Sequence, residues 1–138
     1  MKILIITQYY WPEVFRINDL ADALKARGHD IVVLTGIPNY PTGRFFPGYG
    51  VFSPARERRN GVEIRRVPLI PRGRGGGLRL ALNYVSFAIS ASLLAPWVCR
   101  EQFDAIFVHE PSPITVALPA ILMRRLRRIP LLLWVLDL

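Results

Sequence analysis

The sequence has few of the side chains that form covalent cross-links and metal centres. A single cysteine, Cys99, occurs among 138 residues, so an internal disulfide is excluded and a reducing compartment is favoured. The two histidines, His29 and His109, are isolated, and no cysteine or histidine pair has the spacing of metal ligands. We therefore expect neither a metal site nor a bound cofactor.

Signatures of several common enzyme classes are also missing. No glycine fingerprint follows the first apolar run, which disfavours a dinucleotide fold built on Gly-x-Gly-x-x-Gly. Ser112 lies between two prolines without a nucleophile elbow, and no hydrolase triad is recognisable. The first apolar run breaks at Gln8, so no secretory signal pattern is recognisable, and we expect a cytoplasmic protein.

Acidic residues are scarce relative to basic ones. The chain has 10 acidic and 18 basic residues, and all but two of the basic residues are arginine, which gives a net charge of +8. This balance favours a phosphorylated ligand, an anionic membrane surface or nucleic acid, although general solubility explains it equally well. Because no nucleic-acid recognition motif is present, we expect no nucleic-acid partner.

Apolar residues, by contrast, are abundant at 51%, with a mean hydropathy of +0.27. The run Lys2–Ile6 cannot alternate between core and water, so it predicts a central strand covered on both faces. Residues Glu13–Arg27 show helical periodicity, and a second buried strand follows at Ile31–Thr35. Such a unit predicts a parallel crossover, and hence an α/β, Rossmann-like parallel sheet with helices on both faces.

The rest of the chain continues this alternation of strands and helices. A strand at Val62–Val67 contains charged residues and is therefore expected near the sheet edge. The further predicted elements are a helix at Leu80–Val98, a strand at Asp104–Val108, a short helix from about Ile114 to Arg128, and a strand at Leu131–Leu136. No helix follows this last strand, so we interpret the chain as a fragment.

The helix predicted at Leu80–Val98 has no charged residue over a length close to that of a membrane span. Because polar residues recur in it and Pro96 is expected to break it, we interpret it as a helix packed on the sheet. Three arginines precede it at positions 72, 74 and 79. They favour attachment to anionic lipid over insertion.

Two long loops separate these elements. Residues 36–61 carry several aromatic side chains, which either pack on the domain or bind an apolar ligand. The second loop, Pro71–Gly77, is rich in glycine but lacks the Gly-Lys-Ser/Thr ending of a phosphate loop. We interpret the second loop as a flexible basic linker.

Polar side chains gather where three predicted parallel strands end, at Gln8 and Glu13, at His109 and Glu110, and at Asp137. In an open parallel sheet the ligand crevice lies at this edge. Structural roles are the alternative, since Glu13 can favour a helix start and His109 can satisfy backbone groups. Asp137 is harder to explain by packing, because burying an unpaired carboxylate is costly.

Several blocks of the sequence resemble the amino-terminal domain of family 4 glycosyltransferases, in particular the bacterial surface-polysaccharide subgroup with its fucosamine and colanic-acid-type transferases. The blocks are Gln8–Glu13, Asn18–Ala21, Arg27–His29, Val33–Pro41, Glu110–Pro113 and Trp134–Leu138. The resemblance implies the GT-B architecture, with residues 1–138 as the acceptor-side domain and a donor-binding carboxy-terminal domain outside this chain. This domain alone is then expected to be inactive.

The resemblance further implies retaining transfer without a metal, in which the leaving diphosphate helps to take the acceptor proton. The implied partners are a nucleotide-sugar, expected to be UDP-linked, a polyprenyl-diphosphate-linked saccharide acceptor, and the inner face of the plasma membrane. A non-catalytic ligand-binding or membrane-associated Rossmann-like module is the alternative function.

By position, the resemblance places Asp137 at the reaction centre as the catalytic residue. The substrate-binding residues it implies are Gln8, Glu13, Arg16, Asn39, Tyr40, His109, Glu110 and Ser112. Many relatives have a glycine-rich turn after the first strand, where this chain has Val14-Phe15-Arg16. Arg16, in the first helical turn, is then expected to offer a charged contact to a phosphate.

Overall fold

The computed structural model describes residues 1–51, 55–110 and 114–136. Its centre is a six-stranded sheet with the order β3-β4-β2-β1-β5-β6. The strands are β1 (Lys2–Thr7), β2 (Asp30–Gly36), β3 (Arg56–Arg59), β4 (Val62–Val67), β5 (Ala105–Glu110) and β6 (Leu131–Val135). All neighbouring strands are parallel except β3 and β4.

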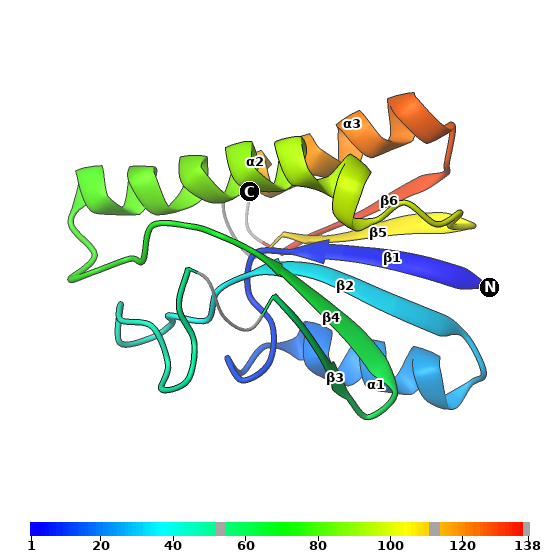
Figure 1. Cartoon of the computed structure of the whole chain (residues 1–138), viewed down its shortest axis with the longest axis horizontal. Helices are drawn as coiled ribbons and strands as arrows, with labels where there is room; N and C mark the ends of the chain where they lie inside the picture. Colours follow the sequence, from blue (N-terminus) through cyan, green and yellow to red (C-terminus); the bar gives the residue numbers. More distant parts are fainter. Residues whose placement is uncertain (52–54, 111–113, 137–138) are drawn as a thin grey trace.

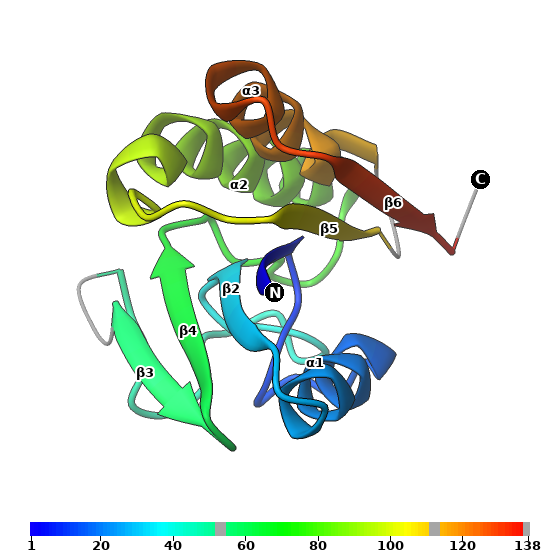
Figure 2. The ribbon, with the colours of Figure 1, turned by 90° about the vertical axis from the view of Figure 1, so that its right-hand side faces the viewer.

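Helices cover both faces of this sheet, as Figures 1 and 2 show. Helix α1 (Arg16–Ala26) lies on one face, and α2 (Gly77–Val98) and α3 (Ala117–Arg127) lie side by side on the other. A short 3-10 turn, η1 (Ile114–Val116), leads into α3. The predicted Rossmann-like α/β fold is therefore confirmed, with one antiparallel strand added to the parallel sheet.

Strand β1 is central, as its apolar run predicts. Leu4 and Ile6 point into the cluster beneath α2 and α3, whereas Ile5 points into the cluster beneath α1. All three side chains are fully buried. Burying such a side chain stabilises the fold by about 1.5–3 kcal/mol.

The predicted position of β4 near the sheet edge is confirmed, because β4 lies next to the edge strand β3 and pairs antiparallel with it. Carboxylates neutralise the charges that suggested an edge. Buried Arg65 pairs with Glu63 at 2.7 Å and with Glu101, and buried Arg66 pairs with Glu57 at 2.7 Å. Paired arginines can occupy an interior strand, since the cost of burying their charge is offset.

Helix α2 packs on the sheet, as we interpreted it, but Pro96 does not break it. Its buried side chains include Phe87, Ala91 and Ala95. Arg127 of α3 donates to the carbonyls of Pro96 (3.1 Å), Cys99 (3.0 Å), Arg100 (2.9 Å) and Glu101 (3.1 Å). These bonds satisfy carbonyls at and just beyond the end of α2 that have no helical partner.

The glycine-rich loop is held against the aromatic loop rather than forming the free linker that we expected. The Gly73 amide donates to the Gly43 carbonyl at 2.9 Å, and the Arg72 amide donates to Asn39 Oδ1 at 2.9 Å. A Cβ atom at Gly43 would lie 1.7 Å from the Gly73 oxygen, so this approach requires glycine.

Candidate ligand site at the carboxyl ends of the strands

The sheet register brings together the strand ends predicted to carry the site. Thr7 at the end of β1 is opposite His109 of β5, and Ile6 is opposite Leu34 of β2. The ends of β2 and β5 therefore lie on either side of the end of β1. In Figure 1 the amino end of α2 lies on this same side of the sheet.

His109 is fully buried, and its hydrogen bonds define its tautomer. The Thr7 hydroxyl donates its proton to the Tyr9 carbonyl at 3.0 Å, so at the 3.0 Å contact with Thr7 Oγ1 the His109 Nδ1 must be the donor. Nε2 is then the acceptor nitrogen, and it has no partner among the described residues. Burial lowers the pKa of His109 to about 4, so the ring is neutral at pH 7.

Two aromatic rings surround His109. Trp134 of β6 lies edge-on at 5.3 Å between ring centroids, and Phe15 lies edge-on at 6.5 Å. The bonding partner of the imidazole is a side chain and not the backbone group that the structural alternative assumed. A neutral imidazole with a free acceptor nitrogen in an aromatic setting is suited to accept a hydrogen bond from a ligand hydroxyl.

Glu13 joins the two loops of the site. Its Oε1 accepts from the Tyr10 amide at 3.2 Å, and its Oε2 accepts from the amides of Asn39 (3.0 Å) and Tyr40 (2.8 Å). Burial raises the pKa of Glu13 to about 7, and these amide bonds act against the rise. Helix α1 begins at Arg16, so Glu13 positions a loop instead of starting the helix.

Gln8 and Asn39 are buried, and most of their side-chain polar atoms form hydrogen bonds to other groups of the protein. Gln8 Nε2 donates to Asn83 Oδ1 at 2.8 Å, while Gln8 Oε1 has no partner among the described residues. Asn39 Nδ2 donates to the Ile37 carbonyl at 3.0 Å, and its Oδ1 accepts the Arg72 amide. Asn39 therefore supports the loops, and Gln8 keeps one acceptor.

Tyr40 belongs to an aromatic cluster with Tyr9 and Phe15. Tyr9 and Phe15 stack at 4.9 Å, and Tyr40 is tilted at 5.7 Å from Tyr9 and 5.2 Å from Phe15. Tyr40 is 36% exposed, so the cluster reaches the surface. The sequence analysis missed Tyr9 and Phe15, although the dense aromatic turn after β1 was a usable signal.

The remaining predicted residues are Arg16, Glu110, Ser112 and Asp137. Arg16 is exposed at the start of α1 and lines a shallow hollow with Trp11 and Asp19. Glu110 ends β5, and Ser112 and Asp137 lie outside the described residues, so their roles stay predictions. Over residues 1–51, 55–110 and 114–136, no group of three His, Cys, Asp or Glu side chains could hold a metal.

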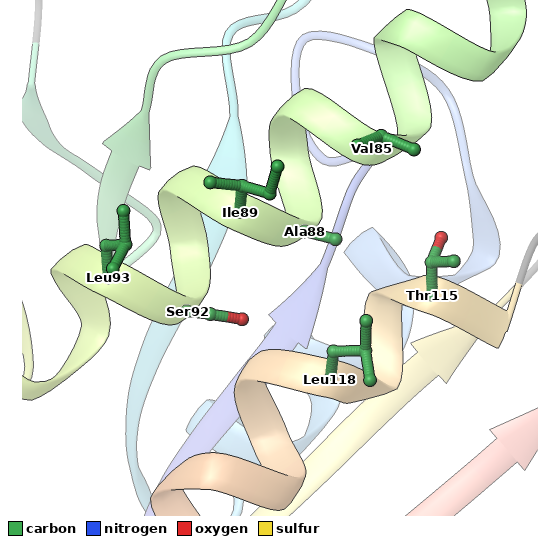
Figure 3. A pocket seen from close by; sticks show the side chains of 7 residues that line it. All are labelled: Val85, Ala88, Ile89, Ser92, Leu93, Thr115 and Leu118. Atoms are coloured by element: carbon green, nitrogen blue, oxygen red, sulfur yellow. The ribbon is translucent and has the colours of Figure 1, made fainter.

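A second feature is an apolar groove on the outer side of the helix layer. It runs between α2 and α3, and Figure 3 shows its lining side chains. They are Val85, Ala88, Ile89, Ser92, Leu93, Thr115 and Leu118. Among the described residues, none that line this groove is charged, which distinguishes it from the polar strand ends.

The fold and the site together define a Rossmann-like α/β domain with a polar and aromatic ligand region beyond its parallel strands. Residues 14–137 match the family of the glycosyl transferase 4-like domain, so the chain belongs to this family. The match begins after Glu13, so it leaves out β1 and most of the turn that follows it, and it includes the end of β5.

The chain is also similar to the putative colanic acid biosynthesis glycosyl transferase WcaI of Escherichia coli strain K12. The two are 30% identical over 95 residues, which is 66% of this chain and 23% of that protein. The chain thus matches about a quarter of the length of this curated relative.

Two crystal structures of the C-terminal domain of a hydrogenase from Pyrococcus furiosus are similar in fold. Their TM-scores are 0.60 and 0.61 at 16% identity, covering 96% of this chain and 89% and 90% of those chains. At this identity the similarity shows the fold alone.

Proposed function

We propose that the chain is the acceptor-side domain of a retaining glycosyltransferase in bacterial polysaccharide biosynthesis. The enzyme moves a sugar from a nucleotide-sugar to a lipid-linked saccharide. Family membership and the similarity to the colanic acid transferase support this proposal. The observation that carries it is the buried, neutral His109 beyond the parallel strands, whose acceptor nitrogen has no partner among the described residues.

In this proposal His109 orients a sugar by accepting a hydrogen bond from one of its hydroxyls at Nε2. Its low pKa makes it a poor proton acceptor, so it positions the sugar rather than deprotonating the acceptor. During transfer the bond from the anomeric carbon to the leaving diphosphate breaks, and a bond to the acceptor oxygen forms. The acceptor proton passes to the leaving diphosphate, and Asp137 stabilises the positive charge on the sugar.

The experiment is a transfer assay with the complete natural protein. UDP-sugars are supplied as donors and polyprenyl-diphosphate-linked saccharides as acceptors, and the product is identified by its mass and anomeric configuration. We expect a lengthened lipid-linked saccharide whose new linkage retains the donor configuration. Inverted product, or no transfer to any lipid-linked acceptor, would contradict the proposal.

We further propose that the outer face of α2 binds the anionic inner surface of the plasma membrane. Six large apolar side chains are exposed at helical spacing on this face: Leu78, Leu82, Val85, Ile89, Leu93 and Trp97. Leu93 and Trp97 are each 67% exposed. The stripe is about 28 Å long at the rise of an α-helix, and such a patch marks an interaction surface.

Charge favours a bilayer as the partner of this face. Neither α2 nor α3 contains an acidic residue, and exposed arginines lie at both ends of the helix layer. They are Arg79 in the first turn of α2, Arg100 just beyond its end, and Arg124, Arg125 and Arg128 at the end of α3. By length and composition α2 could also cross a membrane, but its buried side chains hold it on the sheet, which favours an interfacial position.

Vesicle co-sedimentation tests this surface. We expect the chain to bind vesicles of phosphatidylglycerol more strongly than vesicles of phosphatidylcholine, and the double variant Leu93→Gln, Trp97→Gln to lose roughly tenfold or more in affinity. Val14→Gln is the matched control, because Val14 is 90% exposed but lies far from this face in the sequence and fold. Equal binding by the double variant, or a dimer that buries this face in solution, would contradict the proposal.

A further inference from the structure

Arg72 lies in the glycine-rich loop with its guanidinium surrounded by tyrosines. Its central carbon is 5.7 Å from the ring centre of Tyr9, 5.1 Å from that of Tyr40 and 5.9 Å from that of Tyr84. Its Nη1 donates to the hydroxyl of Tyr9 and, at 3.5 Å, to that of Tyr84. Tyrosines from three separate segments of the chain therefore hold the Arg72 guanidinium in place.

This cation has no acidic partner within 4 Å among the described residues, unlike the buried arginines of β4. Its Nε and Nη2 donors are likewise without a partner there. Burial raises the pKa of Tyr9, so this phenol stays protonated and cannot neutralise the charge. A partly buried guanidinium held by neutral rings is a donor fork that favours an oxyanion.

The loop that carries Arg72 is positioned by the same contacts that organise the site. Glu13 holds the Asn39 amide, and Asn39 Oδ1 in turn accepts the Arg72 amide at 2.9 Å. Arg79 Nε also bonds the Pro71 carbonyl at 2.8 Å. The guanidinium is thus preorganised, which lowers the cost of ordering it when a ligand binds.

The surroundings of Arg72 indicate what accompanies the oxyanion. Tyr9 and Tyr40 contact the guanidinium and also belong to the aromatic cluster with Phe15, which reaches His109. Tyr9 is buried, but the rings of Tyr40 and Phe15 are partly exposed and offer an apolar surface on which the C–H face of a sugar can pack. The Arg72 guanidinium and the His109 imidazole therefore lie at two ends of one continuous aromatic cluster.

We propose that Arg72, with Tyr9, Tyr40 and Tyr84, forms a subsite for the oxyanion of a glycosyl ligand. The group is either a phosphoryl group, as in a sugar diphosphate, or the carboxylate of an acidic sugar. Both present paired oxygens to the Nε and Nη2 edge of the guanidinium. The glycosyl nature of the ligand rests on the proposed function, whereas the oxyanion site follows from the contacts of Arg72.

The test is a titration of the chain with inorganic pyrophosphate and, separately, with glucuronate, followed by NMR. We expect the Arg72 Nε–H resonance to shift with at least one probe, and the preferred probe distinguishes a phosphoryl from a carboxylate ligand. Arg72→Gln should weaken binding roughly tenfold or more. Arg74→Gln is the matched control, because Arg74 is exposed in the same loop, and it should change binding by less than about twofold.

Arg72→Lys keeps the charge but not the fork, so it should bind more weakly than wild type. Melting curves show whether each variant is folded, and the wild-type resonance tests the proposal without any variant. Absence of a shift with both probes, or unchanged binding by folded Arg72→Gln, would overturn the subsite. If the wild-type chain binds the oxyanion but the complete natural protein transfers no sugar, the proposed function alone would be contradicted.

Discussion

His109 and Glu13 are two buried ionisable residues whose environments shift their pKa values in opposite directions. Burial lowers the pKa of His109 to about 4 and raises the pKa of Glu13 to about 7. At neutral pH the imidazole is uncharged, which keeps its Nε2 lone pair available. Glu13 is committed to three amide groups and shapes the loops around the site.

The lowered pKa of His109 predicts a pH dependence of stability. An unfolded histidine titrates near 6.5, so between about pH 6.5 and 4 the unfolded chain binds a proton that the folded chain does not. This residue therefore contributes stability above pH 6.5 that is lost as pH falls through 4, with an upper limit of about 3 kcal/mol.

Urea unfolding at several pH values measures this effect. The free energy of unfolding of wild type should fall more steeply between pH 6.5 and 4 than that of His109→Gln, which cannot titrate. Glu13 changes the pH profile in the opposite sense, but it is present in both proteins and cancels in the difference. Parallel profiles for the two proteins would contradict a buried, neutral His109.

Among the helices, α2 depends on a neighbouring element for its carboxyl end. Arg127 of α3 donates to the carbonyls of Pro96, Cys99, Arg100 and Glu101, at and just beyond the end of α2. The same helix carries Tyr84 toward the strand ends and Leu82 and Val85 on its outer face. Its position therefore affects both proposed binding surfaces.

Replacing Arg127 with methionine tests this interaction, because methionine keeps the aliphatic stem and removes the donors. We expect Arg127→Met to lower the free energy of unfolding by about 2 kcal/mol, as for charged hydrogen bonds to partly buried groups. Arg125→Met is the control, since Arg125 is exposed on the same helix and should change stability by less than about 0.5 kcal/mol. Equal effects of the two substitutions would show that the end of α2 does not depend on Arg127.

Over the whole molecule, the sequence predicted the elements whose patterns are long and apolar. The apolar run at Lys2–Ile6 predicted the central strand. In the structure this strand pairs with β5, which places His109 beside the end of β1. Strand β3 was missed because its four residues are all charged and carry no apolar alternation. Its pairing depends on β4 and on carboxylates that local patterns do not reveal.

The aromatic site around Arg72 could not be predicted for a different reason. Tyr9, Tyr40, Arg72 and Tyr84 come from four separate segments, and only the folded loops bring them together. A backbone hydrogen bond from Gly73 to Gly43 holds two of these loops together. A glycine-rich sequence alone does not predict such a contact. Residue types indicated a ligand region, but the contacts within it required the structure.

In the proposed enzyme, the two surfaces of the domain act on one substrate. In this proposal the apolar face of α2 lies against the bilayer, and Arg72 belongs to the loop that leads into this helix. A lipid-linked acceptor could thus keep its chain in the membrane while its anionic group reaches the guanidinium. The sugar end of the ligand then extends along the aromatic cluster toward His109.

The rate of sugar transfer by the complete natural protein, with and without the His109 imidazole, shows whether the strand-end site binds the transferred sugar. We expect His109→Ala to lower kcat/KM by roughly 10- to 100-fold, the cost of one lost hydrogen bond to substrate, with the protein still folded. Unchanged kcat/KM in the variant would contradict a role for the strand-end site in binding the transferred sugar.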